Sequence, residues 1–254
     1  MADLGALTPV GVVAVLYAIG LARSPLDRGR RLAGWGGIVA LAIALGPPLE
    51  SHAATDLAAH MVQHVVLLAI APPLLIIGAA PAAVLRALPA PPAWTTRAAR
   101  AVVRVPVVLL IAVAIALQTT ALGVWHVPVI YDAAAAHVPL HAAEHLSFLV
   151  TGLAFWWLVA RLGTGSAVIA VFVASLPGTL LGALMTLSTA PWYPRYTTGS
   201  VAAALQDQQL AGVVMWAVGG MAYVAAGAVL FVMWLRDLER VSPARVAMEA
   251  EPAR

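Results

Sequence analysis

Long apolar runs alternate along almost the whole chain with short segments that are rich in proline, glycine and charged residues. A helix needs roughly 20 apolar residues to cross the hydrocarbon core of a bilayer, and most of the runs have about this length. The first two runs are shorter, but neither has the charged face of a helix that lies on a surface. The pattern predicts membrane-spanning helices over residues 7–22, 32–45, 57–79, 101–121, 140–160, 167–187 and 209–235.

The predicted fold class is an all-α membrane protein, a bundle of about seven transmembrane helices. Residues 1–240 are expected to form one transmembrane domain, and residues 241–254 a disordered cytoplasmic tail. Asp3 stands where a secretory signal would carry positive charge, so the first run is interpreted as an uncleaved span. Pro72 and Pro73 lie inside the third run and predict a kink or local opening of that helix.

Arginine follows the apolar runs in alternate connections, which predicts the orientation of the bundle. Cytoplasmic loops of membrane proteins retain positive charge, whereas the opposite loops do not. The arginine-bearing connections and the tail hold Arg23, Arg28, Arg30, Arg31, Arg86, Arg97, Arg100, Arg104, Arg161, Arg236, Arg240 and Arg245. The other three connections together contain one arginine, Arg195. We therefore expect the N-terminus outside and the C-terminus in the cytoplasm.

Composition agrees with this interpretation and narrows the chemistry. With 62% hydrophobic and 10% charged residues, the chain cannot cover a soluble surface with polar groups. The absence of lysine beside abundant alanine, glycine and proline is typical of a GC-rich bacterial genome, so a multi-pass protein of the bacterial plasma (inner) membrane, in contact with membrane lipid, is expected. The arginines lie in short loops, which argues against nucleic-acid binding. Because the chain has no cysteine, metal ligands must come from histidine, methionine or carboxylates.

All seven histidines lie in a predicted outer connection or within two turns of the outer end of a span. They are His52, His60, His64, His126, His137, His141 and His145. The same outer connections hold aromatic residues that predict an interfacial belt, namely Trp125, Tyr131, Trp192, Tyr193 and Tyr196. An ionisable side chain inside a span is costly unless it is paired or lines a cavity, so the histidines within spans are candidates for function.

Two of the predicted spans carry a histidine pair with the same spacing. Residues four apart project from one face of a helix, and both imidazoles of such a pair can reach one ion. His60 and His64 form one pair, and His141 and His145 form the other. Both spans begin at the outer face, so packed together they would present four imidazoles at one depth. We predict that these four residues are the metal ligands.

Polar residues near the pairs are expected to support the site. Gln63 and Glu144 lie on the same stripes and are interpreted as groups that orient the imidazoles, or as additional ligands. Asp56 lies on the first stripe, one turn before His60. Asp207, at the outer start of the last span, is expected either to close the site or to cap its own helix.

The remaining histidines are interpreted as auxiliary. His137 directly precedes the fifth span and lies near enough to join the site or to guard its entrance. His52 and His126 fit interfacial or loop positions better than ligand positions. No catalytic residue is assigned.

An outward-facing site without thiolates favours copper, although imidazole also suits zinc, iron and nickel. Haem held by one histidine from each of two helices is an alternative. Two histidines at i and i+4 cannot be the opposite axial ligands of one haem, which favours direct chelation.

The segments "HMVQHVVLLAIAPPLLIIGAAP", "LHAAEHLSFLVTGLAFWW" and "DQQLAGVVMWAVGG" together resemble the seven-span CtaG family of cytochrome c oxidase assembly proteins. The resemblance implies a role in maturing a haem-copper oxidase, including delivery of copper to its outward-facing centre. The implied partners are oxidase subunits or a periplasmic copper donor. The matching positions are His60, Gln63, His64, His141, Glu144, His145 and Asp207. Their role as copper ligands is inferred from the residue types.

Two other functions are compatible with parts of the sequence. The segment from His141 to His145 reads HxxEH, an inverted zinc-hydrolase signature in which Glu144 would activate a zinc-bound water. A copper transporter would need ligands at mid-membrane depth, where Met215, Met221 and Gln118 are the candidates. An assembly factor that is not an enzyme is preferred, because the HxxEH segment has a partner stripe with Gln63 in place of a base.

Overall fold

The structure is a computed structural model that describes residues 7–89, 105–197 and 199–249, with side chains up to residue 240. Within these ranges the chain forms helices and short connections and has no β-strand. The helices in chain order are α1 (Leu7–Arg23), α2 (Arg28–Leu45), α3 (Leu49–Ala53), α4 (Leu57–Val65), η2 (Val66–Ile70), α5 (Ala71–Ile77), α6 (Ala80–Ala87), α8 (Val107–Trp125), α9 (Pro128–Ala136), α10 (Val138–Val159), α11 (Thr164–Leu187), η3 (Pro194–Tyr196), α12 (Val201–Val213), η4 (Val214–Gly219) and α13 (Gly220–Glu249).

Five helical segments are long and apolar enough to cross a membrane. They are Leu57–Ile77, Val107–Trp125, Val138–Val159, Thr164–Leu187 and Val201–Arg240, and α1 is a shorter apolar helix. Large apolar side chains such as Leu109, Phe172 and Leu180 are more than half exposed on these helices, as expected for a surface that faces lipid. The all-helical fold class is confirmed, whereas the seven spans and their orientation stay predictions.

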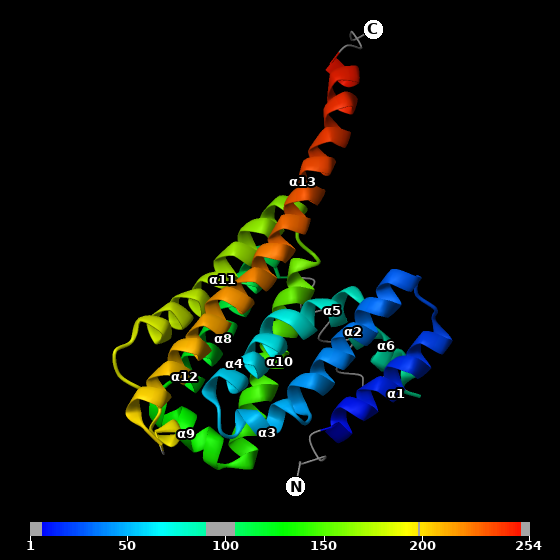
Figure 1. Ribbon diagram of the computed structural model, residues 1–254. Helices are drawn as coiled ribbons and strands as arrows, with labels where there is room; N and C mark the ends of the chain where they lie inside the picture. The colour runs from blue at the N-terminus through cyan, green and yellow to red at the C-terminus, as the bar shows by residue number, and fades with distance from the viewer. Residues whose placement is uncertain (1–6, 90–104, 198, 250–254) are drawn as a thin grey trace.

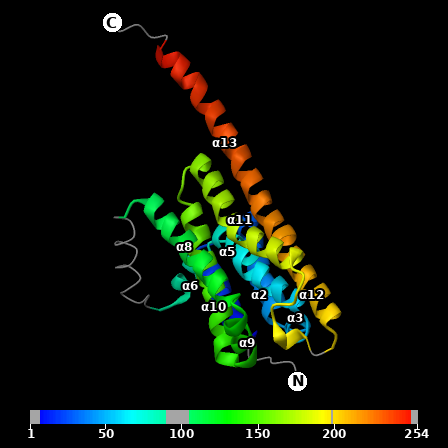
Figure 2. The same ribbon diagram turned by 90° about the vertical axis from the view of Figure 1, so that its left-hand side faces the viewer.

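The helices pack in a bundle whose two ends differ (Figure 1). α1 packs against α6, α2 against α5, α8 against α10, and α11 against α12 and α13. The short helices α3 and α9 lie at one end, where α1 and α10 begin, and α13 extends beyond the other end (Figures 1 and 2). The connection between α10 and α11 lies towards the end from which α13 extends. The end with α3 and α9 is the one that the sequence predicts to face outwards.

The predicted tail falls partly within the last helix. α13 continues to Glu249, so it includes residues 241–249, and residues 250–254 lie outside the described part of the chain. The division into a transmembrane domain and a tail stays a prediction.

The two prolines of the third predicted span lie next to a π-helical turn, η2, between α4 and α5. Pro72 has no N–H, so the carbonyl of Leu68 loses its helical hydrogen bond. The Trp156 Nε1–H of α10 donates to this carbonyl at 3.2 Å. Gly152 allows the close approach, because a Cβ there would lie 2.9 Å from Pro72 Cγ. These contacts at the irregular turn hold the continuous helical segment α4–η2–α5 against α10.

Candidate metal centre

The packing of α4 against α10 brings the four predicted ligands together as one group, which we call the histidine cluster (His60, His64, His141 and His145). The ring centroids of His60 and His64 lie 4.5 Å apart, those of His60 and His141 5.1 Å, and those of His141 and His145 4.1 Å. Three of the four residues are buried, and the His141 side chain is 24% exposed. The cluster therefore reaches solvent on the side of His141.

Two overlapping sets of donor atoms in the cluster have the spacing of a metal site. One set is His60, His64 and His145, and the other is His60, His141 and Glu144. Within each set the ligand atoms all lie within 4.8 Å of one another. Because His60 belongs to both, the two sets form one continuous group of donors.

The Glu144 carboxylate lies between the imidazoles of the cluster. Its side chain is fully buried, with Oε1 3.3 Å from His64 Nε2 and Oε2 3.9 Å from His60 Nε2. The sequence interpretation left Glu144 as an orienting group or an additional ligand. Its position among the imidazoles makes its carboxylate available to a cation held by the same group.

The nitrogen and oxygen atoms of this group that could bind a metal have no hydrogen-bond partner among the described residues. These buried atoms are His60 Nε2, His64 Nδ1 and Nε2, His141 Nε2, His145 Nε2, and both carboxyl oxygens of Glu144. Buried polar atoms in folded proteins are nearly always satisfied, and an unsatisfied one costs roughly 1–3 kcal/mol. A cation bound between them would satisfy several at once, so the residues present fit a metal ion.

Tyr131 of α9 orients His60 through a chain of hydrogen bonds. The Tyr196 hydroxyl donates to the Ala53 carbonyl at 3.3 Å, so the Tyr131 hydroxyl, 3.0 Å away, must donate to Tyr196. Tyr131 is then left to accept from His60 Nδ1–H at 2.9 Å. Burial raises the pKa of Tyr131 well above its ordinary value and that of Tyr196 to about 12, so both hydroxyls keep their protons. This series of hydrogen bonds keeps the proton of His60 on Nδ1, so the lone pair of Nε2 is directed towards Glu144.

His126 lies in the connection between α8 and α9 and is buried beside the cluster. Its ring centroid lies 5.4 Å from that of His64, and its Nδ1 lies 2.8 Å from the Leu122 carbonyl oxygen. Burial lowers the pKa of His126 to about 4, so the imidazole is neutral at physiological pH. By contrast, His52 and His137 are exposed and belong to neither set of donors.

The comparison with known families gives one match. A family model described as cytochrome c oxidase caa3 assembly factor (Caa3_CtaG) matches residues 15–237. The chain belongs to this family. No curated protein and no solved structure matches it. The resemblance inferred from the three segments is confirmed, and the matched region contains every residue of the cluster.

Gln63 of this assembly factor makes no hydrogen bond to an imidazole among the described residues. Its Nε2 donates to the Ala44 carbonyl at 2.7 Å and to a carboxyl oxygen of Glu50. The other Glu50 oxygen lies 3.9 Å from His141 Nδ1. Glu50, which the sequence analysis did not single out, therefore joins Gln63 to the solvent side of the cluster.

Asp207 performs a task that neither sequence interpretation included. Its carboxylate accepts from the backbone N–H groups of Leu57 at 2.7 Å and Ala58 at 3.1 Å, so it caps α4 from α12. The cap of α12 itself is Ser200, whose side chain accepts from the N–H of Ala203. Asp207 thus fixes the start of the helix that carries His60 and His64.

Asp56 belongs to neither set of metal donors. It is exposed, makes no cap hydrogen bond to α4, and accepts from Thr55 Oγ1 at 2.9 Å.

Replacement of Asp207 by alanine is expected to lower the free energy of unfolding by about 1–2 kcal/mol, because two N–H groups lose their acceptor. Thermal unfolding of the assembly factor in detergent measures the change. Asp56→Ala is the matched control, since it removes a carboxylate from the same helix start without a cap bond. Equal effects of the two substitutions would contradict the cap.

Replacement of Tyr131 by phenylalanine is expected to weaken metal binding about 10–100-fold, because His60 loses the partner that fixes its tautomer. Tyr223→Phe is the control, since Tyr223 is also buried and accepts from Gln118 Nε2 at 2.7 Å. Metal titration of both variants measures the affinity. A Tyr131→Phe protein that binds metal as tightly as the control would show that the hydrogen bond does not matter.

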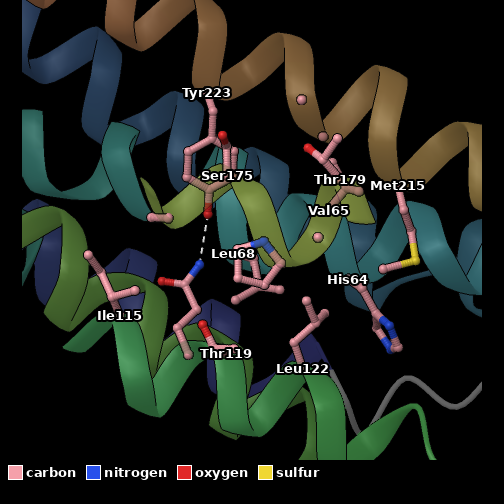
Figure 3. A pocket seen from close by; sticks show the side chains of 16 residues that line it. His64, Val65, Leu68, Ile115, Thr119, Leu122, Ser175, Thr179, Met215 and Tyr223 are labelled. Atoms are coloured by element: carbon pink, nitrogen blue, oxygen red, sulfur yellow. Dashed lines mark hydrogen bonds between the residues drawn. The ribbon is translucent and has the colours of Figure 1, made fainter. Parts of the chain in front are cut away.

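A cavity of about 390 Å³ adjoins the centre, with Glu50, His141 and His145 in its wall. Two smaller cavities also adjoin the centre. The first, of about 190 Å³, has Glu50, His60, His141 and Arg195 in its wall and lies on the solvent side. The second, of about 50 Å³, has His64 in its wall and is shown in Figure 3.

Two of the three mid-membrane residues that a copper transporter would need as ligands, Met215 and Gln118, line the second cavity. His64 and Met215 line one side of it, and Tyr223 lies across from them (Figure 3), with Gln118 also in the wall. Met221, however, is 62% exposed on the outside of the bundle and does not line this cavity.

Proposed function

We propose that this oxidase assembly factor binds copper at the histidine cluster and at Glu144, and that it assists metallation of the oxidase. The observation that supports the proposal is the convergence of four imidazoles and one buried carboxylate whose donor atoms have no other partner in the described part of the chain. Copper bound there is cargo for the oxidase and not a catalyst in its own right.

Copper is the metal that this set of donors favours. The donors are imidazole nitrogens and a carboxylate, the chain has no cysteine to supply a thiolate, and copper accepts both donor types. The packing supports direct chelation over haem, because the imidazoles of the two helices lie against one another and leave no plane for a porphyrin between them.

The position of Glu144 also supports binding over hydrolysis. A zinc hydrolase would use this carboxylate as a base acting on a metal-bound water. Here both carboxyl oxygens are directed at imidazole nitrogens of α4, and the side chain is fully buried. A ligand needs this arrangement, whereas a base needs room for water and substrate.

The proposed partners are oxidase subunits or a copper donor on the outer side of the membrane. The cavity beside His141 and Glu50 lies on the solvent side of the cluster, at the end of the bundle that holds α3 and α9. A partner that docks at this end would reach the ion without crossing the lipid-facing surface.

Elemental analysis and an absorption spectrum of the purified protein test the proposal. Stoichiometric copper without a haem Soret band is expected, together with copper-deficient oxidase in cells that lack the protein. Bound haem, or bound zinc with a hydrolytic turnover that depends on Glu144, would overturn it.

A further inference from the structure

Met61 and His126 form a contact at the edge of the histidine cluster that the cluster itself does not explain. Met61 Sδ lies 3.4 Å from His126 Nε2, and both side chains are buried, with Met61 completely so. The contact joins α4 to the connection between α8 and α9, which are 65 residues apart in sequence.

The hydrogen bonding of His126 places a lone pair in this contact. Nδ1 lies 2.8 Å from the carbonyl oxygen of Leu122, which can only accept, so Nδ1 carries the proton. In the neutral imidazole, Nε2 is then an acceptor that faces the thioether sulfur, which is also an acceptor. Two buried acceptors face each other without a donor between them, and a bound cation would resolve this contact.

The separation of the two atoms suits one ion. Bonds of about 2.0 Å to nitrogen and about 2.3 Å to sulfur, at a tetrahedral angle, separate the two donors by about 3.5 Å. The observed 3.4 Å agrees with this value. His64, whose ring lies 5.4 Å from that of His126 and whose nitrogens have no partner in the described residues, supplies a third donor nearby.

We propose that Met61, His126 and His64 form a second metal position that selects the cuprous ion, beside the position made by His60, His141 and Glu144. Thioether ligands prefer Cu(I), whereas carboxylate with imidazole suits Cu(II). The two positions share no ligand, so the centre accommodates either oxidation state with its own ligands. This inference rests on the proposed copper function.

X-ray absorption at the copper edge tests the proposal on the intact protein in detergent. The protein is loaded with Cu(I) under anaerobic conditions with ascorbate, a reductant that contains no sulfur. Because the chain has no cysteine, any sulfur bound to copper must come from methionine. A copper–sulfur distance of about 2.3 Å is expected in the wild type.

Met61→Leu is the decisive variant, and Met185→Leu is its matched control, because both methionines are fully buried in helices. Met61→Leu is expected to lose the sulfur signal and to bind Cu(I) at least about 10-fold more weakly, with Cu(II) affinity changed less than about 2-fold. The control should keep the sulfur signal and both affinities.

The outcomes separate this inference from the function on which it rests. Cu(I) bound by nitrogen and oxygen alone, or a sulfur signal that persists in Met61→Leu, would overturn the second position and leave copper binding intact. A wild-type protein that binds copper in neither oxidation state would overturn the proposed function, and this inference with it.

Discussion

Alanine at His60, His64, His141 and His145 together is expected to abolish copper binding by the purified protein. Removal of groups that only orient a ligand already costs about 10–100-fold in metal affinity, so loss of four ligands should exceed about 1,000-fold. Alanine is the best helix former, and therefore α4 and α10 should persist. Copper titration measures the affinity, and circular dichroism checks the helices. The oxidase of cells that carry this variant should be deficient in copper.

The matched control uses two histidines at the same end of the bundle. His52 and His137 are exposed and belong to neither set of donors, so His52→Ala with His137→Ala should leave copper binding within about 2-fold of the wild type. The site assignment would be wrong if the fourfold variant kept its copper and supported normal oxidase activity. It would also be wrong if the control lost copper as completely.

Replacement of Glu144 by glutamine should have opposite effects on the metal-free and the copper-bound protein. Without metal, a buried carboxylate beside neutral imidazoles is costly, whereas a glutamine amide can donate to His64 Nε2, which lies 3.3 Å from Oε1 in the native protein. The metal-free variant should therefore be about 1–3 kcal/mol more stable. Copper affinity should fall at least about 100-fold, because the ion loses its one buried negative charge.

Thermal unfolding with and without copper measures both effects, since a ligand of the folded state raises the unfolding temperature in proportion to its affinity. Glu50→Gln is the control, because Glu50 lies at the solvent side and 3.9 Å from His141, and it should reduce copper affinity much less. If Glu144→Gln kept its metal and lost a hydrolytic activity, the zinc-hydrolase reading of the HxxEH segment would be correct.

The helices and the pairing of the main ligands follow from local rules. An apolar run of about 20 residues can satisfy its backbone in lipid only as a helix, so the spans over residues 57–77 and 138–159 were predictable to within a few residues. The i, i+4 spacing places both histidines of a pair on one face of its helix whatever surrounds it. The concentration of histidine at one end also follows from the order of loops and spans.

Proximity between distant segments is not encoded in such local patterns. Tyr131 was expected in an interfacial belt, yet it bonds to His60, which is 71 residues away. Asp207 caps a helix that begins 150 residues earlier in the chain. Each of these contacts depends on which helices are neighbours, how they are rotated and how far they are shifted along one another.

The same holds for the relation between ligands and supporting groups. Residue types alone made Gln63 and Glu144 equivalent, because both follow a histidine by three residues on matching stripes. Packing separates them, since Glu144 points between the imidazoles and Gln63 points away to Glu50. The amino-acid pattern thus determines that a membrane bundle carries two histidine pairs at one end. Only tertiary packing decides which neighbouring groups complete the centre, because a helix presents several faces and its partners select among them.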